Sequence, residues 1–497
     1  MNQKQRTVAL TMIVSVAYLV LRWRLLLNPG MTFDLDLYKE WLLKATEFGI
    51  SQIYRTSSMD YPPVYAYILK LFGWLYTLMA AHGLAGPRAL TTLVKLPPLL
   101  FDFGIASLLW RCASLEGKSV EWRAAVAAGY LFNPAVLFLS GYWGAPDPIH
   151  SFFILACFVT VAYGARFWFR SNENRDVPVS IAALALAWTF LTLAALMKPL
   201  GLPYFPLLLF FSLISRGVRG AVIGMATSIF AGLLVFSPFL VRANALEVFN
   251  RVLTDIGAMP FTSSNAHNFW WLIGGWYYSE VSWIGPLTPT QVGLILFGLC
   301  YIALSWKAWR QYLLQNRKLS AAQTLATAAM VSFSFFMFST HLHEHHLFAT
   351  VPLLASFAVS NRVWRNVFLC VSVGVFINCW LHDSPMDTPH WPYTIGGPTS
   401  VEHPPKFDRP YYVAELVAIW SSVFFNLVVY SVTMAGVFWP GKRGWLARLS
   451  ASAENAPAIL GTGTAPGEQS SLPKESGACG GHSCGQSTRA TSDFGNV

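Results

Sequence analysis

The sequence has 497 residues, of which 54% are hydrophobic and 12% are charged, and its mean hydropathy is +0.45. Soluble domains usually carry about 25% charged residues, so this composition excludes an ordinary soluble enzyme. Apolar runs of about 20 residues recur along the chain, which is the length of a membrane-spanning helix. The net charge of +10 fits basic loops that orient a membrane protein, and does not by itself indicate nucleic-acid binding. The sequence therefore predicts an all-α polytopic membrane protein.

Twelve apolar segments are predicted to span the membrane. Within a few residues they are 8–21, 93–111, 123–140, 150–168, 179–197, 202–215, 220–240, 287–306, 322–340, 347–361, 366–381 and 412–438. Residues 64–81 are also apolar enough to span, but counting them would invert the charge pattern of the later loops. We expect this piece to be interfacial or re-entrant, with an ordinary span as the alternative.

The charges of the loops predict the orientation of the chain. With twelve spans, the loops rich in Lys and Arg all fall on the side of the N-terminus. This side is expected to be cytoplasmic, and it would hold both termini. The tail carries no address for retention in the endoplasmic reticulum, so a bacterial inner or plasma membrane is favoured.

Four regions follow from this pattern. Residues 1–24 hold the first transmembrane helix, residues 25–92 form a long first external loop with short interfacial helices, and residues 93–440 form the transmembrane bundle. The bundle is expected to carry external loops at 141–150, 241–286 and 382–411. Residues 441–497 are rich in Gly, Ser, Ala, Thr and Pro and cannot bury enough apolar surface to fold, so a disordered cytoplasmic tail is predicted.

The first external loop carries two acidic clusters beside aromatic residues. Asp34 and Asp36 precede Trp41, and Asp60-Tyr61-Pro62-Pro63 follows, with two prolines that stiffen the backbone. A carboxylate held on such a scaffold is a candidate general base, and we assign this role to Asp34. Three alternatives stay open: the Asp-x-Asp pair binds a divalent metal, Asp36 caps a helix predicted over 37–48, or both are solvated loop acids.

Four charged residues lie inside the spans or at their ends. Lys95 and Asp102 are seven residues apart, so one face of a helix carries both. A charge at the bilayer centre costs about 2.5–3.5 kcal/mol, so Asp102 either faces a partner or a water-filled cavity, or is held by hydrogen bonds inside the bundle. Asp147 opens a span, where a helix cap is the alternative to a role in the site. Lys198 ends a span externally, and either extends to the interface or binds an anion.

Two further polar stretches are expected on the external side. The run His341-Leu342-His343-Glu344-His345-His346 lacks the H-E-x-x-H zinc pattern, because position 347 is Leu. A phosphate contact, structural histidines and a zinc site remain open for it. In the second large loop, Arg251 precedes Asn268-Phe269-Trp270-Trp271. These aromatic residues suit either sugar stacking or the aromatic belt of a membrane interface.

These motifs, in this order, resemble the multi-spanning GT-C glycosyltransferases that take sugar from a polyprenyl phosphate. The resemblance is greatest to the endoplasmic-reticulum glucosyltransferases that use dolichyl-phosphate-glucose to extend lipid-linked oligosaccharide, and to their bacterial relatives. It covers roughly residues 8–380. The matching elements are the Asp seven residues before a Trp (Asp34, Trp41), D-Y-P-P (Asp60–Pro63), the basic residue seven before an intramembrane Asp (Lys95, Asp102), K-x7-P (Lys198, Pro206), N-F-W (Asn268–Trp270) and V-H-E-K (Leu342–His345).

The chain departs from the family pattern at two places. The bacterial W-G-Q-x-D-S element reads Trp143-Gly144-Ala145-Pro146-Asp147-Pro148 here, so the Gln and the Ser are missing. The Lys that follows H-E in the family is His345. Both differences concern the sugar and the phosphate contacts.

The resemblance implies a GT-C-like fold and an inverting transfer of a hexose, glucose or mannose, from a polyprenyl-phosphate carrier. The acceptor would be a lipid-linked or cell-envelope glycan on the external face of the membrane. Asp34 would take the proton of the acceptor hydroxyl. Residues expected to contact the donor phosphate or substrate are Lys198, His343, Glu344, Arg251, Asn268 and Lys95. Residues expected to support the site are Asp36, Trp41, Asp60, Tyr61, Asp102, Asp147 and His341.

The expected partners are the polyprenyl-phosphate sugar, the glycan or glycolipid acceptor and membrane lipid, with no nucleic acid. No cofactor is expected, and cations at the phosphate would make a divalent metal unnecessary. A transporter or flippase for lipid-linked saccharides is one alternative, but the polar residues gather on one face and no inverted repeat is visible. An oligosaccharide polymerase or ligase with a diphosphate-linked donor is another.

Overall fold

The computed structural model describes residues 3–168, 179–242, 244–258, 260–273, 278–318, 320–358, 361–383 and 410–438. The predicted tail 441–497 and nearly all of the predicted loop 382–411 lie outside the described residues. The described chain is helical apart from two short strands, β1 (Ser263–Ser264) and β2 (Leu342–His343), which pair in parallel. The prediction of an all-α polytopic membrane protein is confirmed.

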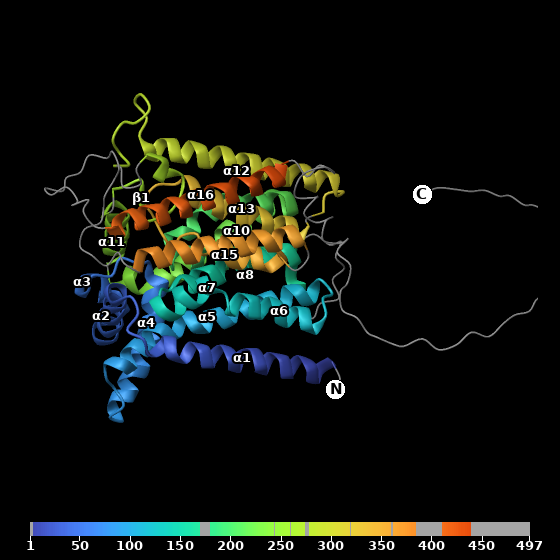
Figure 1. Ribbon diagram of the computed structural model, residues 1–497. Coiled ribbons are helices and arrows are strands. Elements are labelled where there is room, and N and C mark those ends of the chain that lie inside the picture. The colour runs from blue at the N-terminus through green and yellow to red at the C-terminus, as the bar shows by residue number, and fades with distance from the viewer. Residues whose placement is uncertain are drawn as a thin grey trace, which may run out of the picture. The chain divides into compact units, whose positions relative to one another are not determined.

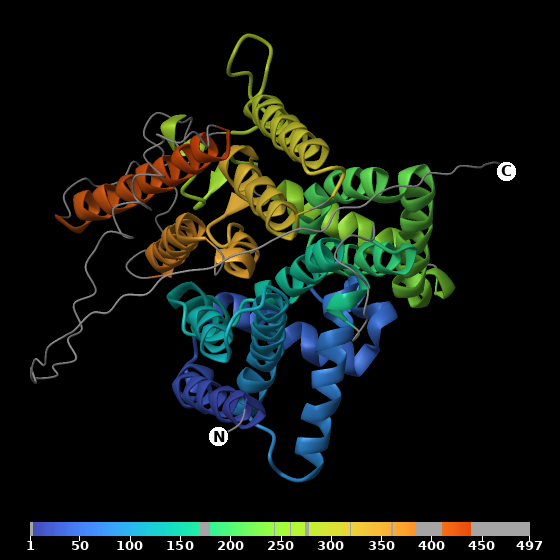
Figure 2. The same ribbon diagram turned by 90° about the vertical axis from the view of Figure 1, so that its right-hand side faces the viewer.

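The long helices lie side by side in a bundle (Figures 1 and 2). They are α1 (Gln3–Leu27), α5 (Pro87–Leu115), α6 (Val120–Leu131), α8 (Asp147–Tyr163), α9 (Ile181–Ala195), α10 (Phe205–Val241), α12 (Pro289–Leu314), α13 (Ala321–Phe338), α15 (Arg362–Asp383) and α16 (Pro410–Phe438). The remaining helical elements are α2 (Thr32–Phe48), η1 (Ile50–Gln52), α3 (Ile53–Thr56), α4 (Pro63–Ala81), α7 (Pro134–Val136), η2 (Leu137–Trp143), η3 (Gly164–Phe167), η4 (Pro199–Tyr204), α11 (Ala245–Ala258), η5 (Phe269–Ile273) and α14 (Thr350–Ala358).

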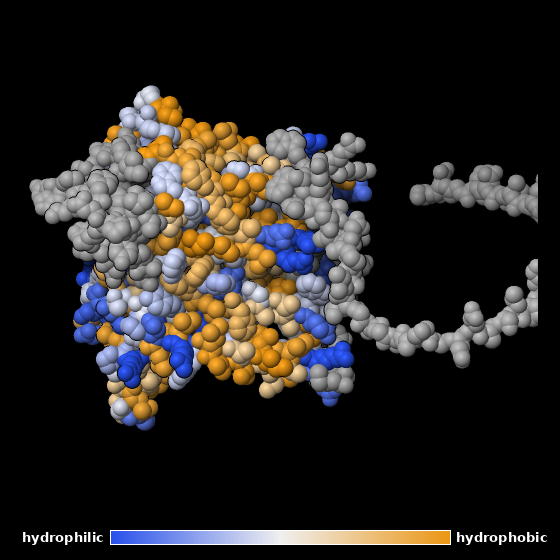
Figure 3. All heavy atoms as spheres, in the orientation of Figure 1, coloured by the Kyte–Doolittle hydropathy of each residue, from blue (hydrophilic) through white to orange (hydrophobic). Residues whose placement is uncertain are grey.

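An apolar band covers the middle of the bundle, and hydrophilic residues gather toward its two ends (Figure 3). Among the described residues, nine helices are long and apolar enough to cross a membrane, by length and composition. The number becomes ten if α6 and the segment Pro134–Trp143, bent by 44°, form one span. Twelve spans were predicted, and they differ from these helices in four ways. Helix α9 has only 15 residues, α14 has nine, and two predicted spans fall within α10. The predicted span 123–140 is the bent pair, and α4, which was expected to be interfacial or re-entrant, is among the nine by length and composition.

Helix α10 doubles back at Gly217, where φ is +62°. The Trp188 indole donates to Ser212 Oγ at 3.0 Å, and the same indole lies where a Cβ on Gly224 would be, so position 224 admits only glycine. A straight helix would place residues 212 and 224 about 18 Å apart, too far to meet one indole. The two halves of α10 therefore match the predicted segments 202–215 and 220–240.

Helix α4 lies steeply across the direction of α1 (Figures 1 and 2). It begins at Pro63, whose fixed φ suits the first turn of a helix, and it packs on α2, where Gly73 lies against Thr46 and the Leu42 carbonyl. Elements α2, α3 and α11 lie at one end of the bundle, which we call the site end, and the N-terminus of α1 lies at the opposite, far end (Figure 1).

Candidate active site

Asp34 lies in the first turn of α2 and not in a loop. The helix begins at Thr32 instead of the predicted residue 37, so Asp36 does not cap it. Residues two apart in a helix point about 200° away from each other, and Asp36 is exposed and pairs with Lys39 at 2.9 Å. The two carboxylates therefore diverge and do not form a chelating pair. Across the described residues, no group of three or more His, Cys, Asp or Glu side chains is arranged to hold a metal ion.

The carboxylate of Asp34 is held by an indole. Its Oδ2 accepts a hydrogen bond from Trp143 Nε1 at 2.7 Å. Burial raises the pKa of Asp34 above its ordinary value, and outweighs the Trp143 hydrogen bond and the charge of Lys198, which lower it. A carboxylate with a raised pKa is a stronger base, and this is the property that proton abstraction near neutral pH requires.

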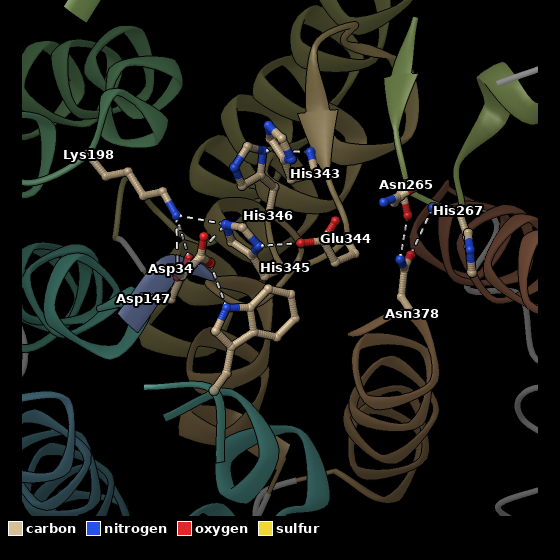
Figure 4. Close-up of polar contacts among 11 residues, drawn as sticks. Asp34, Asp147, Lys198, Asn265, His267, His343, Glu344, His345, His346 and Asn378 are labelled. Atoms are coloured by element: carbon tan, nitrogen blue, oxygen red, sulfur yellow. Dashed lines mark hydrogen bonds and ion pairs between the residues drawn. The ribbon is translucent and has the colours of Figure 1, made fainter. Parts of the chain in front are cut away.

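Asp147 and Lys198 form a buried ion pair beside Asp34 (Figure 4). Asp147 opens α8 and Lys198 precedes η4, and the Lys198 ammonium donates to both carboxylate oxygens at 3.1 and 3.2 Å. The exposed fractions of the two side chains are 0% for Asp147 and 7% for Lys198. The Tyr61 ring lies 5.5 Å from the ammonium. The cap alternative for Asp147 does not hold, because the N-cap of α8 is Pro146 and no side chain caps the helix. Asp147 instead neutralises a cation that would otherwise be buried alone.

The hydrogen bonds assign the protonation of His345. Lys198 Nζ lies 3.0 Å from His345 Nε2, and an ammonium can only donate, so Nε2 accepts. The proton of the neutral ring is then on Nδ1, which donates to Glu344 Oε1 at 2.9 Å. Asp147, Lys198, His345 and Glu344 therefore form one continuous chain of hydrogen bonds (Figure 4). Together with Asp34 and Trp143 we call these residues the site cluster.

The two neighbouring histidines pack around His345. The rings of His343 and His345 stack with centroids 5.9 Å apart, and the His343 backbone N–H donates to His346 Nδ1 at 3.1 Å. Burial, together with the nearby charge of Lys198, holds the pKa of His346 well below its ordinary value, so this ring is neutral. Sequence reasoning assigned the phosphate contact to His343, whereas in the structure it is His345 that contacts Lys198.

The loop that carries these histidines is fixed by its neighbours. Strand β2 pairs with β1, and His341, at φ +62°, has its ring nitrogens 2.9 Å from Ser279 Oγ and Thr340 Oγ1. Asn378 Oδ1 accepts from the His267 backbone N–H at 2.8 Å, and its amide donates to the Asn265 carbonyl at 2.7 Å (Figure 4). Backbone and amide contacts thus hold the histidine loop beside α15.

An aromatic group lies beneath the site cluster. Tyr38, Trp41, Tyr61 and Tyr65 have ring centroids between 5.4 and 6.3 Å apart. The D-Y-P-P element joins this group through Tyr61, and burial followed by the charge of Asp60 raises the pKa of Tyr54 well above its ordinary value. Trp41 and Tyr61 therefore support the site by packing.

Besides His343, three predicted substrate contacts lie outside the site cluster. Lys95 donates to the carbonyls of Leu25, Asn28 and Tyr142 at 3.1, 2.8 and 2.8 Å, which occupies all three ammonium protons. Asn268 donates to the Phe336 carbonyl at 2.9 Å, and so fastens its loop to α13. Arg251 is exposed on α11.

Asp102 is likewise separate from Lys95, although both lie on α5. It accepts hydrogen bonds from Tyr18, Tyr130 and Ser140, and lies 3.6 Å from Arg22. We call these five residues the α1 lock, because they join α1 to the bundle. Asp102 thus has both a charged partner, Arg22, and hydrogen bonds inside the bundle.

Sequence reasoning missed three members or neighbours of the site. His345 was considered only as part of the histidine run and as a departure from the family pattern, and was not chosen as a site residue. Trp143 lies four residues before Asp147 without any sign that its indole binds Asp34. His150 lies one helical turn after Asp147, is 1% exposed, and has no hydrogen-bond partner on either ring nitrogen within the described residues. The sequence offered one signal for Trp143 and His150: both lie about one helical turn from Asp147.

The chain was compared with known proteins. No protein-family model and no curated protein matches it. Among solved structures it is similar to the archaeal oligosaccharyltransferase AglB from Archaeoglobus fulgidus, in complex with an inhibitory peptide and a dolichol-phosphate. The identity is 12% and the TM-score 0.40, over 91% of this chain and 58% of AglB. A likeness at this level does not identify the fold family or the function.

Proposed function

We propose that this protein is an inverting glycosyltransferase of the GT-C type. It moves a hexose from a polyprenyl-phosphate carrier to a lipid-linked or cell-envelope glycan on the external face of the membrane. The proposal is carried by one observation: Asp34, with its raised pKa, lies beside a buried cation that could face a leaving phosphate. Three residues of the site cluster, Asp34, Lys198 and Glu344, belong to the motifs that suggest the GT-C likeness.

Asp34 is the general base in this mechanism. It takes the proton of the acceptor hydroxyl as that oxygen attacks the anomeric carbon, and the bond from this carbon to the carrier phosphate breaks on the opposite face. The Trp143 N–H fixes the direction of the carboxylate and stabilises its charged form. A positioned base of this kind contributes about 10²–10⁴-fold to the rate.

Lys198 stabilises the leaving phosphate. Charge grows on the phosphate as the glycosidic bond breaks, so a nearby ammonium interacts more strongly with the transition state than with the donor. In the structure this ammonium is shared between Asp147 and His345, and an arriving phosphate oxygen takes over one of its three donor positions. Asp147 and Glu344 hold the cation and His345 in place, so both act by positioning.

The location of the site cluster favours a transferase over a transporter. A transporter would place its polar site near the middle of the bundle, between its repeats. Asp34 follows α1 directly, Lys198 precedes η4, and α2 lies at the site end of the bundle (Figure 1). The crosswise direction of α4 supports an interfacial place for the segment 63–81, and so an external first loop.

The test uses purified full-length protein with polyprenyl-phosphate-hexose and a membrane glycolipid extract as acceptor. Release of polyprenyl phosphate that depends on the acceptor is the expected result. A transporter releases none, and a polymerase or ligase requires a diphosphate-linked donor. No release from the monophosphate donor under any acceptor would overturn the proposal.

A further inference from the structure

A cavity of about 260 Å³ opens at the far end of the bundle. Its walls are α12 and α16, its floor is α13, and Trp364 of α15 closes one side. In Figure 2, α13 lies between α12 on one side and α15 and α16 on the other. Tyr430 of α16 donates to Cys300 Sγ of α12 at 3.3 Å, so these two helices are also in contact outside the cavity.

The cavity is separate from the site cluster. The first turn of α12 lies at the site end, where Thr290 is 3.1 Å from Thr340 in the histidine loop. Lys307, which lines the cavity, is more than four turns further along the same helix, about 25 Å away by helical rise. A ligand here would therefore not touch the proposed catalytic residues.

The chemistry of the walls favours an anionic amphiphile. None of the twelve residues lining the cavity, all within the described chain, is acidic, and Lys307 is their one cation. The Lys307 ammonium lies 5.6 Å from the Phe438 ring, and amides of Gln311 and Gln315 supply further donors. Leu304 and Met330 make the inner wall apolar.

One buried hydrogen-bond acceptor beside the cavity lacks a donor. Gln323 donates to the Ala308 carbonyl at 3.0 Å, but its Oε1 is buried and has no partner among the described residues. A buried acceptor without a partner costs about 1–3 kcal/mol, so a hydroxyl group near this wall would stabilise the fold. A phosphate for Lys307 together with a hydroxyl for Gln323 is the headgroup of a phosphoglycerol lipid.

We propose that this cavity binds the headgroup of an anionic, hydroxyl-bearing glycerophospholipid, with its chains lying along α12 and α16. Basic pockets between transmembrane helices are suited to such headgroups. The site is independent of the transferase proposal, since it is argued from Lys307, Gln323 and the cavity alone.

The probe is phosphatidylglycerol, compared with phosphatidylcholine of the same chains. Full-length protein in detergent is titrated with each lipid, and binding is followed by native mass spectrometry and by the thermal midpoint. Phosphatidylglycerol should bind more tightly, since the choline cation of the other lipid is repelled by Lys307. Equal binding of the two lipids would overturn the proposal.

Variants at two positions distinguish binding in this cavity from a general effect of surface charge. Lys307→Gln should weaken phosphatidylglycerol binding about fivefold, the usual effect of one cation near an anionic lipid, while Lys307→Arg keeps it. The matched control is Arg310→Gln, an exposed cation one turn away on α12 that does not line the cavity, with no more than a twofold change. Equal losses in both glutamine variants would refute the site.

Soluble glycerol 3-phosphate distinguishes the two sources of the headgroup. It should neither shift the thermal midpoint nor displace the lipid at concentrations where phosphatidylglycerol saturates. If it binds as tightly as the lipid, the cavity takes a free phosphate ester and the lipid assignment is wrong.

Discussion

The α1 lock and the site cluster both contain buried charges, and the two clusters compensate these charges in different ways. In the α1 lock, the Asp102 carboxylate meets three hydroxyl donors besides Arg22, and both charged side chains are 0% exposed. In the site cluster, Lys198 and His345 are 7% and 12% exposed, and Lys198 meets the carboxylate of Asp147 and an imidazole.

The partners and the exposure of a buried charge distinguish a structural charge from a functional one. Burial alone does not, because Asp102 and Asp147 are equally buried. Where three hydroxyls and a guanidinium surround a carboxylate and both charged side chains are fully buried, the network joins helices and is closed to a ligand from solvent. Where a cation keeps some exposure and lies beside a base of raised pKa, a substrate can compete for it. The predictions below test this contrast.

The largest expected effect is on turnover. Asp34→Asn should lower the rate of polyprenyl-phosphate release by about 10²–10⁴-fold, because the amide cannot take a proton. Donor binding should remain near that of the wild type. Asp36→Asn is the matched control, since Asp36 is exposed on the same helix, and it should change turnover less than twofold. Wild-type turnover in Asp34→Asn would remove Asp34 from the role of base.

Stability should respond most to the α1 lock. Arg22→Met leaves Asp102 buried without its cation, which typically costs about 3–5 kcal/mol, and combining it with Asp102→Leu should recover much of this loss. Thermal unfolding in detergent measures both. Lys39→Met breaks only the exposed pair with Asp36 and should cost about 0–1 kcal/mol. If Arg22→Met and Lys39→Met cost the same, the α1 lock does not hold the bundle.

The Trp143 hydrogen bond should set the acid limb of the pH profile. Trp143→Phe removes the donor that stabilises the Asp34 carboxylate, so the pKa of Asp34 rises further and activity is lost at a higher pH on acidification. A hydrogen bond to a charged group contributes about 1.5–3 kcal/mol, or roughly one to two pH units. The measurement is kcat/KM against pH, and an unchanged acid limb would mean that another group titrates.

His346 should make stability fall in mild acid. Its pKa in the folded protein lies well below 6.5, so below that pH the unfolded chain binds a proton that the folded chain does not. Stability is then complete above the unfolded pKa of about 6.5, and declines by up to about 1.4 kcal/mol per pH unit below it. His346→Asn should flatten the pH dependence of the thermal midpoint between 5 and 6.5, whereas a parallel curve would contradict this account.

The positions of helices were accessible from sequence because membrane spans are set by local composition. The predicted break between 215 and 220 is found at Gly217, and each predicted span falls on helical residues, with 123–140 divided among α6, α7 and η2. The start of α2 was missed because Asp36 is a favoured N-cap residue type and was taken as the cap, whereas the observed N-cap is Met31, which makes no side-chain hydrogen bond.

The candidate site was predictable only as a set of residues on one side of the membrane. Asp34, Asp147, Lys198 and Glu344 were singled out, but Lys95 and Asp102 were singled out on the same grounds and belong elsewhere. A charge in an apolar segment must have a partner, and sequence shows this need without showing the partner.

The sequence by itself determined the class of the protein, since a chain with this composition has to satisfy its backbone inside a bilayer through helices. The tertiary structure alone decided which charges meet. Lys198, His345 and Asp147 are far apart in the chain, and the pairing of Asp102 with Arg22 spans α1 and α5. Such contacts depend on how helices pack in three dimensions, and this information is spread over the whole chain and carried by no local motif.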